Sequence, residues 1–222
     1  MKPITPPIAF IFDMDGTLAD TMRYHIDAWH QIFIALGLEH TRDYVERHAY
    51  GTNTEFARRM IGEHLSYAET EQIVVRKETA YRAIAQLAPI PGALSFLQQA
   101  RQAGIPIALG TMADPDNIAF VLDGLAIRHQ FDVVLGAADV THGKPHPEIF
   151  LRAAEALHVP PEQCIVFEDA IGGVEAAQRA GMACVALTTT RPSADFAQFG
   201  NVVCTAPDFE ALSLDELLVA IP

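Results

Sequence analysis

Short apolar runs and helical stripes alternate along the chain, and the first of these runs ends in acidic residues. Residues 8–12, IAFIF, are rich in isoleucine and phenylalanine, which is typical of a buried strand. Asp13 and Asp15 follow at once, and Gly16 comes directly after them. Because side chains two apart on a strand share a side, we expect the two carboxylates to project together. Such a pair repels itself unless a cation, a proton or buried hydrogen bonds lie between its members.

A block without strand-like runs follows this first predicted strand. Residues 22–36 place apolar side chains at helical spacing, and Gly37 is suited to end that helix. Two further stripes predict helices, the first with Phe56, Met60 and His64 and the second with Ile73, Lys77, Tyr81 and Ile84. Residues 89–92, PIPG, carry two prolines and a glycine and mark a linker. The pattern predicts an inserted α-helical domain over residues 20–88.

Beyond this linker, helical stripes and strand-like runs alternate. Strands are predicted at residues 107–109, 133–135, 165–167, 184–187 and, as a short edge strand, 202–203. Helices are predicted at residues 94–100, from Asp114-Pro115 onward, at 147–157, at 172–180 and, behind a capping box, at 213–216. This alternation predicts an α/β fold, with a Rossmann-like parallel sheet flanked by helices. Residues 1–19 and 89–222 would form it, with the α-helical domain inserted.

Composition narrows the classes of function. The chain has 222 residues, half of them hydrophobic, and a formal net charge of −13, which argues against a nucleic-acid partner. It contains no apolar run of membrane-spanning length, and residues 1–7 lack the apolar segment of a signal peptide, so we expect a cytoplasmic protein. The three cysteines are odd in number and form no Cys-x-x-Cys pair, which favours reduced thiols.

Parallel sheets place their sites at the carboxyl ends of strands, and polar residues collect there. Thr111, with Met112 beside it, follows the strand at 107–109, and Glu168-Asp169 follows the strand at 165–167. Lys144 lies in the loop between them. A rim that carries Asp13, Asp15, Glu168 and Asp169 favours a hard cation, above all Mg²⁺. A cation, a lysine and backbone donors around a carboxylate suit phosphoryl transfer, and the carboxylate can itself be the nucleophile.

These residues resemble the four motifs of the haloacid dehalogenase-like phosphohydrolases. Residues 13–17, DMDGT, are similar to the first motif, and Thr111, Lys144-Pro145 and Glu168-Asp169 match the others in order. The resemblance implies that Asp13 is the nucleophile and Asp15 the general acid and base. It also implies that Asp13, the Asp15 carbonyl and Asp169 hold Mg²⁺, with Glu168 acting through water or as a supporting residue. Thr111 and Lys144 would hold the transferred phosphoryl group.

The helical insertion resembles the cap of the β-phosphoglucomutase-like and sugar-phosphatase branch of that family. Residues 24–29 are similar to its first cap helix, which leaves two roles open for His25: a contact with Asp15 or the substrate, and a packing or surface role. Residues 51–55, GTNTE, are similar to the cap loop that faces the site, which makes Thr52 and Asn53, with Met112 from the core, candidates for substrate contact.

Three departures from the mutases of this branch favour a hydrolase. Those mutases carry an arginine in the cap loop, where this chain has Thr54 and Glu55. They carry a cap lysine after a tyrosine, and an ungapped match to Tyr81 places Ala83 there. Thr17 also stands where a valine is common in mutases.

Side chains outside the motifs are assigned structural roles. His142 and His146 have the spacing of a helical metal pair, but Gly143 and Pro145 interrupt a helix, so no zinc site is predicted. Trp29 and Phe33 are expected in the core of the cap. A solvated helix face is the simplest interpretation of the charged group Glu69, Glu71, Arg76, Lys77 and Glu78.

The leading hypothesis is a Mg²⁺-dependent phosphatase of a small phosphorylated metabolite, with a sugar phosphate favoured by analogy. Its intermediate would be an aspartyl-phosphate. A β-phosphoglucomutase-type phosphomutase, an inorganic pyrophosphatase and, outside enzymes, a phosphometabolite-binding regulator remain as alternatives. We expect a monomer with no nucleic-acid or membrane partner.

Overall fold

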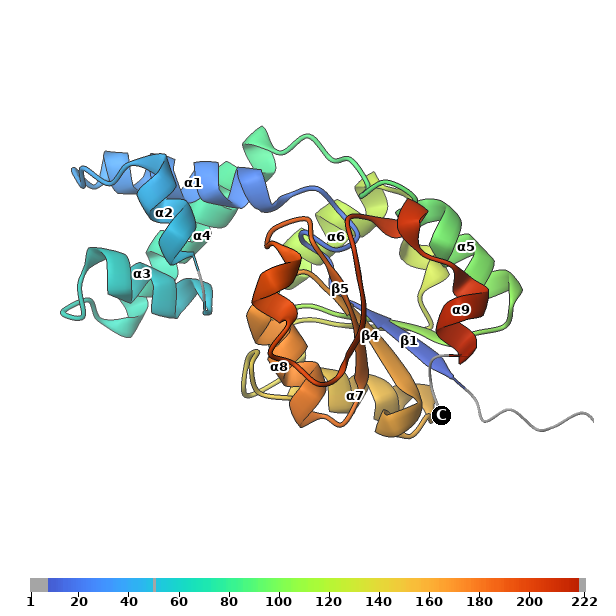
Figure 1. Cartoon of the computed structure of the whole chain (residues 1–222). Coiled ribbons are helices and arrows are strands. Elements are labelled where there is room, and N and C mark those ends of the chain that lie inside the picture. Colours follow the sequence, from blue (N-terminus) through green and yellow to red (C-terminus); the bar gives the residue numbers. More distant parts are fainter. Residues whose placement is uncertain (1–7, 50, 220–222) are drawn as a thin grey trace, which may run out of the picture. The chain divides into compact units, whose positions relative to one another are not determined.

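The computed structural model describes residues 8–49 and 51–219, so the N-terminal heptapeptide considered above lies outside the described residues. Contacts within the chain define two compact units. The first, which we call the core unit, comprises the chain up to Asp20 and from Ala88 onward; the second, the helical unit, comprises Thr21–Leu87 (Figure 1). Within the described part of the chain, no helix is both long and apolar enough to cross a bilayer.

The core unit is built on a parallel sheet. Its described strands are β1 (Ala9–Phe12), β2 (Ile107–Gly110), β3 (Val133–Leu135), β4 (Cys164–Glu168), β5 (Ala183–Leu187) and β6 (Val202–Ala206). They lie in the order β3-β2-β1-β4-β5-β6, and every pairing is parallel. The predicted α/β fold with a Rossmann-like sheet is therefore confirmed.

This strand order places the reversal of the sheet between β1 and β4. The chain adds β2 and β3 on one side of β1 and then returns to add β4 on the other side. Phe12 at the end of β1 pairs with Leu109 on β2 and with Phe167 on β4, so the carboxyl ends of these three strands coincide. A topological switch point at such an edge is where open α/β sheets bind their ligands.

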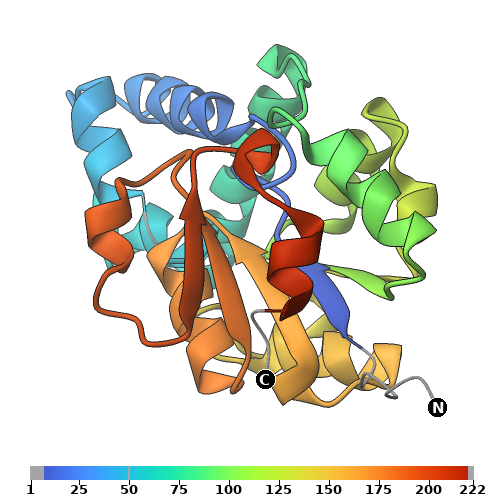
Figure 2. The same cartoon turned by 45° about the vertical axis from the view of Figure 1, so that its right-hand side comes forward.

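Helices cover both faces of the sheet (Figures 1 and 2). α7 (Glu148–Leu157) and α8 (Ile171–Arg179) lie on one face, and α5 (Ala93–Gln102) and α6 (Pro115–Gly124) on the other, with α9 (Leu214–Val219) against α5. These helices begin and end within a few residues of their predicted limits. Asp114 caps α6 as predicted, because its side chain accepts a hydrogen bond from Asn117 N at 2.9 Å.

An aromatic cluster fills the layer between the sheet and α5. Phe12 and Phe167 stack with ring centroids 4.4 Å apart, although they come from strands distant in sequence. Phe96 of α5 lies over both, and Phe209 closes the cluster from the C-terminal segment. Buried aromatic pairs stabilise a core beyond the area that they bury. This cluster thus holds β1 and β4 together directly beneath their carboxyl ends.

The chain leaves and re-enters the core unit through two paired segments. Asp20 N donates to Ala88 O at 2.9 Å, and Ile90 N donates to Leu18 O at 2.9 Å. Ala19 and Pro89 form an antiparallel bridge between these two hydrogen bonds. The second crossing between the units, at Leu87–Ala88, thus lies directly before the proline-rich residues 89–92, and hydrogen bonds fasten it to the first crossing.

The helical unit contains α1 (Met22–Ala35), α2 (Arg42–His48), α3 (Asn53–Ile61) and α4 (Tyr67–Ile84). Trp29 and Phe33 of α1 are buried and pack with Phe56 of α3, which confirms their predicted place in the core of this unit. The prediction that the helix with Phe56 and Met60 extends to His64 was wrong. α3 stops at Ile61, and Gly62 follows with a φ of 149°, so His64 is not on the helix.

Strand β6 is longer than the predicted two-residue segment. Its burial alternates along its length, as expected for an edge strand with one solvated face. Cys204 and Thr205 interrupt the apolar run there, which is why the hydrophobic pattern revealed only its first residues. Cys164 and Cys184 are buried free thiols, whereas Cys204 on this edge is partly exposed.

The aromatic cluster makes a first prediction, for which α5 supplies a matched control. Phe96 is 2% exposed and lies within the cluster, whereas Leu94 on the same helix is 42% exposed. We expect Phe96→Ala to lower the free energy of unfolding by about 3–5 kcal/mol, because it leaves a cavity. Leu94→Ala should change it by about 0.5 kcal/mol or less. Urea unfolding of both variants measures this difference, and equal effects would contradict the assigned packing.

Candidate active site

Three carboxylates meet at the switch point of the sheet. Asp13 directly follows β1, and its backbone N–H donates to Phe167 O of β4 at 3.0 Å. Glu168 ends β4, and Asp169 is the next residue. One oxygen from each of these three side chains lies within 4.8 Å of the others, and all three residues are buried. Two adjacent parallel strands thus deliver the cluster, as the sequence predicted.

Lys144 enters this cluster from the loop that precedes α7. Its Nζ donates to Asp13 Oδ1 at 2.6 Å and to Glu168 Oε1 at 2.7 Å. The ammonium also lies 4.8 Å from the ring centroid of Phe150, which covers it from α7. A lysine 131 residues after Asp13 in the chain is therefore the direct partner of the carboxylate predicted to be the nucleophile.

Backbone donors and a glycine set the orientation of Glu168. Its Oε2 accepts hydrogen bonds from the N–H groups of Asp169 and Ala170, both at 2.9 Å. Gly173 on α8 leaves the room for this side chain, because a Cβ there would lie 1.8 Å from Glu168 Oε1. Glu168 therefore aims its other oxygen at Lys144.

Asp169 is held by two hydroxyl groups. Thr17 Oγ1 donates to its Oδ1 at 2.9 Å, and Thr190 Oγ1 donates to its Oδ2 at 2.7 Å. Gly16 adopts a φ of 83°, and a Cβ at that position would lie 2.4 Å from Asp169 Oδ2. Only glycine therefore suits the turn after Asp15 without displacing this carboxylate.

Burial and the mutual repulsion of the carboxylates alter their pKa values. Burial, and then the charge of Glu168, raises the pKa of Asp169 to about 7, although the hydroxyls of Thr190 and Thr17 oppose the shift. Burial likewise raises the pKa of Asp13 well above its ordinary value, while Lys144 opposes this. Burial disfavours the charge of Lys144, but Asp13 and Glu168 outweigh it and hold the lysine pKa above its ordinary value. Without a cation, burial therefore favours the protonated forms of Asp13 and Asp169.

The other predicted core residues lie at the same edge of the sheet. Asp15 is partly buried in the turn after β1, where Gly16 N donates to Ala19 O at 2.8 Å. Thr111 directly follows β2 and is buried, and its Oγ1 accepts a hydrogen bond from Ala113 N at 3.3 Å. Met112 beside it is partly buried. These three residues follow strands that adjoin the carboxylate cluster.

Two threonines that were not among the predicted site residues also adjoin the carboxylate cluster. Thr190 binds Asp169, and the adjacent Thr189 donates to Gly16 O at 2.6 Å. Both follow β5, the strand next to β4. Their place just after a predicted strand was the available signal, since polar residues at the carboxyl ends of parallel strands share one edge.

Two of the predicted cap residues have partners within the helical unit. Thr52 caps α3, where its hydroxyl accepts from Glu55 N at 3.2 Å and the Glu55 carboxylate accepts from Thr52 N. Asn53 Nδ2 donates to Glu78 Oε1 at 2.7 Å. The segment predicted as a cap loop, residues 51–55, is therefore largely the first turn of α3, held by a capping box and by the contact of Asn53 with a buried carboxylate.

The prediction that Lys77 and Glu78 lie on a solvated face was wrong. They are 1% and 5% exposed, and Lys77 Nζ lies 2.9 Å from Glu78 Oε1. Lys77 Nζ also lies 2.7 Å from His25 Nδ1, and the His25 ring stacks on Tyr81 at 3.8 Å. The helical stripe through Lys77 and Tyr81 was the correct signal, and the charges are tolerated because they pair inside the unit. Glu69 and Arg76 are exposed as predicted.

Comparisons with known proteins agree with this arrangement. A family model described as haloacid dehalogenase-like hydrolase matches residues 9–181. The chain is 33% identical to the validoxylamine A 7'-phosphate phosphatase of Streptomyces hygroscopicus subsp. limoneus, over 85% of this chain and 89% of that one. It is 33% identical to the fructose-1-phosphate phosphatase of Escherichia coli, over 78% and 92% of the two chains. The structure of β-phosphoglucomutase from Clostridium difficile superimposes with a TM-score of 0.83 at 26% identity, over 97% of each chain.

The parallel sheet, the carboxylate cluster at its switch point and the matching model identify the chain as a hydrolase. It belongs to the haloacid dehalogenase-like hydrolase family, as the four motifs indicated. The recognition of this family from the sequence is confirmed.

The carboxylate cluster predicts how stability depends on pH and on divalent cations. In metal-free protein Asp169 keeps its proton up to about pH 7 in the folded state, but it loses the proton near 3.8 when unfolded. Between these values the folded state binds more protons, so stability should fall as pH rises, and Asp13 acts in the same direction. Thermal unfolding in a chelator measures this trend, and Asp169→Asn should reduce it. Saturating Mg²⁺ should also flatten it, and a metal-free midpoint that rises across this range would contradict the assignment.

Adjacent glycines on α8 provide a matched pair of variants. A Cβ at Gly172 meets nothing within 4 Å, whereas one at Gly173 collides with Glu168. We expect Gly172→Ala to be neutral or to stabilise by up to about 1 kcal/mol, because alanine favours a helix. Gly173→Ala should destabilise by about 1–3 kcal/mol. It should also weaken Mg²⁺ binding, since Glu168 must leave Lys144. Urea unfolding and calorimetric titration with Mg²⁺ measure both effects, and similar behaviour of the two variants would contradict this account.

Proposed function

We propose that this chain is a Mg²⁺-dependent phosphatase that hydrolyses a small phosphorylated metabolite, with a sugar phosphate as the favoured class. The observation that carries the proposal is the contact of Lys144 with Asp13 inside the buried carboxylate cluster. A nucleophilic carboxylate needs a nearby positive charge to receive the phosphoryl group, and Lys144 supplies it. The names of two relatives, phosphatases of a fructose phosphate and of validoxylamine A 7'-phosphate, support the substrate class.

In the proposed reaction, Asp13 attacks phosphorus in line and forms an aspartyl-phosphate while the P–O bond to the metabolite breaks. Asp15 gives its proton to the leaving oxygen, and it then takes a proton from the water that hydrolyses the aspartyl-phosphate. Lys144 and Thr111 hold the phosphoryl oxygens throughout. The products are the dephosphorylated metabolite and inorganic phosphate, and both aspartates return to their starting states.

The donor set of the cluster fits Mg²⁺. Its groups are oxygens only, and they are buried. The pKa values of Asp13 and Asp169 are raised first by burial and then by the neighbouring carboxylates, and a divalent cation would oppose both effects. Asp13, Asp169 and the Asp15 carbonyl would hold the ion, with Glu168 as a supporting residue. The bound ion supplies positive charge beside the phosphoryl oxygens.

The helical unit is proposed to serve as the cap that excludes bulk water and selects the substrate. His25 is its first candidate contact to substrate or to Asp15, with Thr52 and Asn53 in the cap loop and Met112 in the core. Lys77 adds a buried positive charge next to His25. The helical unit thus contains a buried lysine before Tyr81, although the ungapped match to the mutases has Ala83 at the position of their cap lysine.

A phosphomutase is therefore retained as the second candidate, supported by Lys77 and by the similarity to β-phosphoglucomutase. The preference for hydrolysis rests on Thr54 and Glu55 in the cap loop and on Thr17. Thr17 is committed to Asp169, a contact that valine could not make. Interconversion of glucose 1- and 6-phosphates with little phosphate release would favour the mutase.

The test is phosphate release from a panel of phosphorylated metabolites with and without Mg²⁺, for the natural chain and two variants. Asp13→Asn should abolish turnover. Asp15→Ala should lower kcat by about a hundredfold or more, because it removes the general acid and base. It should nevertheless keep Mg²⁺ affinity, since the proposed ligand is a main-chain carbonyl.

Two outcomes would contradict these assignments. Loss of Mg²⁺ affinity in Asp15→Ala with turnover intact would reverse the role of Asp15. If the chain bound one metabolite tightly but hydrolysed no member of the panel, the phosphatase hypothesis would be wrong and a phosphometabolite-binding regulator would be favoured.

A further inference from the structure

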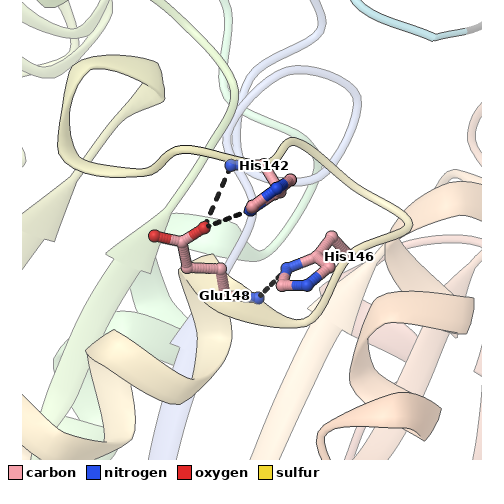
Figure 3. A group of neighbouring side chains, drawn as sticks. All are labelled: His142, His146 and Glu148. Atoms are coloured by element: carbon pink, nitrogen blue, oxygen red, sulfur yellow. Dashed lines mark hydrogen bonds and ion pairs between the residues drawn. The ribbon is translucent and has the colours of Figure 1, made fainter.

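The loop that carries Lys144 brings two histidines and a carboxylate together on the core unit (Figure 3). Residues 142–147 form turns, as Gly143 and Pro145 suggested, and His146 N donates to Gly143 O at 3.0 Å. Even so, the rings of His142 and His146 lie 4.5 Å apart, centroid to centroid. A turn therefore brings the two rings together, although their spacing in the sequence suggested proximity only on a helix.

Glu148, the first residue of α7, completes the group. Its Oε2 lies 3.2 Å from His142 Nδ1, and its backbone N–H faces His146 Nδ1 at 3.3 Å (Figure 3). One donor atom from each of the three side chains lies within 4.8 Å of the others. Either a proton or a metal ion can bridge the His142 imidazole and the Glu148 carboxylate at this separation.

Backbone N–H groups and an arginine hold the carboxylate in place independently of the two imidazole rings. Glu148 accepts from Thr141 N at 3.1 Å and from His142 N at 3.0 Å, and Arg152 pairs with it at 2.8 Å. In contrast, the side chain of His142 is 62% exposed, and its contact with Glu148 Oε2 at 3.2 Å is one that a bound ion would replace. The exposed imidazole rings can therefore move toward a bound ion while the Glu148 carboxylate stays in place.

We propose that His142, His146 and Glu148 bind a transition-metal cation, Zn²⁺ in the first place, at a site distinct from the carboxylate cluster. Two imidazoles and one carboxylate are a common donor set for Zn²⁺, with water in the fourth position. Mg²⁺ prefers oxygen donors, so the two sites differ in the ion that they select. Tetrahedral donors stand about 2.0–2.2 Å from Zn²⁺, which requires the three groups to approach slightly.

The location gives this site a consequence for the loop. His142 and His146 lie two residues before and two residues after Lys144, whose ammonium binds Asp13. An ion held by both histidines would fasten the two flanks of Lys144 to the start of α7. Bound Zn²⁺ would thereby restrict the motion of this loop. Among the described interactions, Lys144 of this loop supplies the positive charge in contact with Asp13 and Glu168.

The experiment is calorimetric titration of the whole chain with Zn²⁺ in saturating Mg²⁺, which occupies the carboxylate cluster. We expect one Zn²⁺ per chain, and His142→Ala and His146→Ala should each weaken it by about tenfold or more, because each removes a ligand. His129→Ala is the matched control, since His129 is an exposed histidine of the same unit outside this group. It should bind Zn²⁺ as the natural chain does.

A second measurement addresses the donor set and does not depend on activity. Co²⁺ in place of Zn²⁺ should give the visible absorption of a tetrahedral site, and His142→Ala/His146→Ala should lose it. Both histidine side chains are exposed, so urea unfolding should be unchanged in that double variant. The proposal is overturned if the natural chain takes up no Zn²⁺ beyond the double variant, or if His129→Ala weakens binding as much as His146→Ala.

Discussion

The arrangement of the core unit depends on gathering Asp13, Glu168 and Asp169 in a buried place around a single ammonium group. Such a cluster repels itself, and burial makes the repulsion stronger. Lys144 compensates part of it through contacts of 2.6 and 2.7 Å with Asp13 and Glu168. The remaining excess of negative charge makes the site suitable for a divalent cation. Much around it serves to hold the carboxylates still, including two glycines that leave them room and hydroxyl groups that bind Asp169.

The helical unit also buries charged side chains, but there a positive and a negative charge are paired. Lys77 and Glu78 are as deeply buried as the carboxylate cluster, but they are one cation and one anion in direct contact. Asn53 and His25 take up further hydrogen-bonding capacity of this pair. The charges of Lys77 and Glu78 balance each other, whereas three carboxylates share one lysine in the core unit. The two buried networks therefore differ in net charge, and of the two only the carboxylate cluster offers an excess of carboxylate oxygens that a divalent cation could bind.

Much of this could be foreseen because it is local. The apolar run before Asp13 and those before Thr111 and Glu168 mark strand ends, and parallel strands bring such ends to one edge. The order of motifs then indicated the family. Errors arose where a local pattern was ambiguous. Lys77 and Glu78 look solvated because charge usually means exposure, and only their mutual contact allows burial. The proximity of His142 and His146 had no periodic signal, because a turn and not a helix brings their rings to 4.5 Å.

The α/β class, the family and the residues at the rim of the sheet could be inferred from the amino-acid sequence alone. Those conclusions follow from periodicity and from short motifs, which are properties of neighbouring residues. The contacts between groups became visible only in the folded chain: Lys144 with Asp13, Thr190 with Asp169, Lys77 with His25, and His142 with Glu148. The first three join residues distant along the chain, and the last depends on a turn that no periodicity encodes. Contacts of this kind are set by strand order, loop path and close packing, and these become defined only when the whole chain has folded.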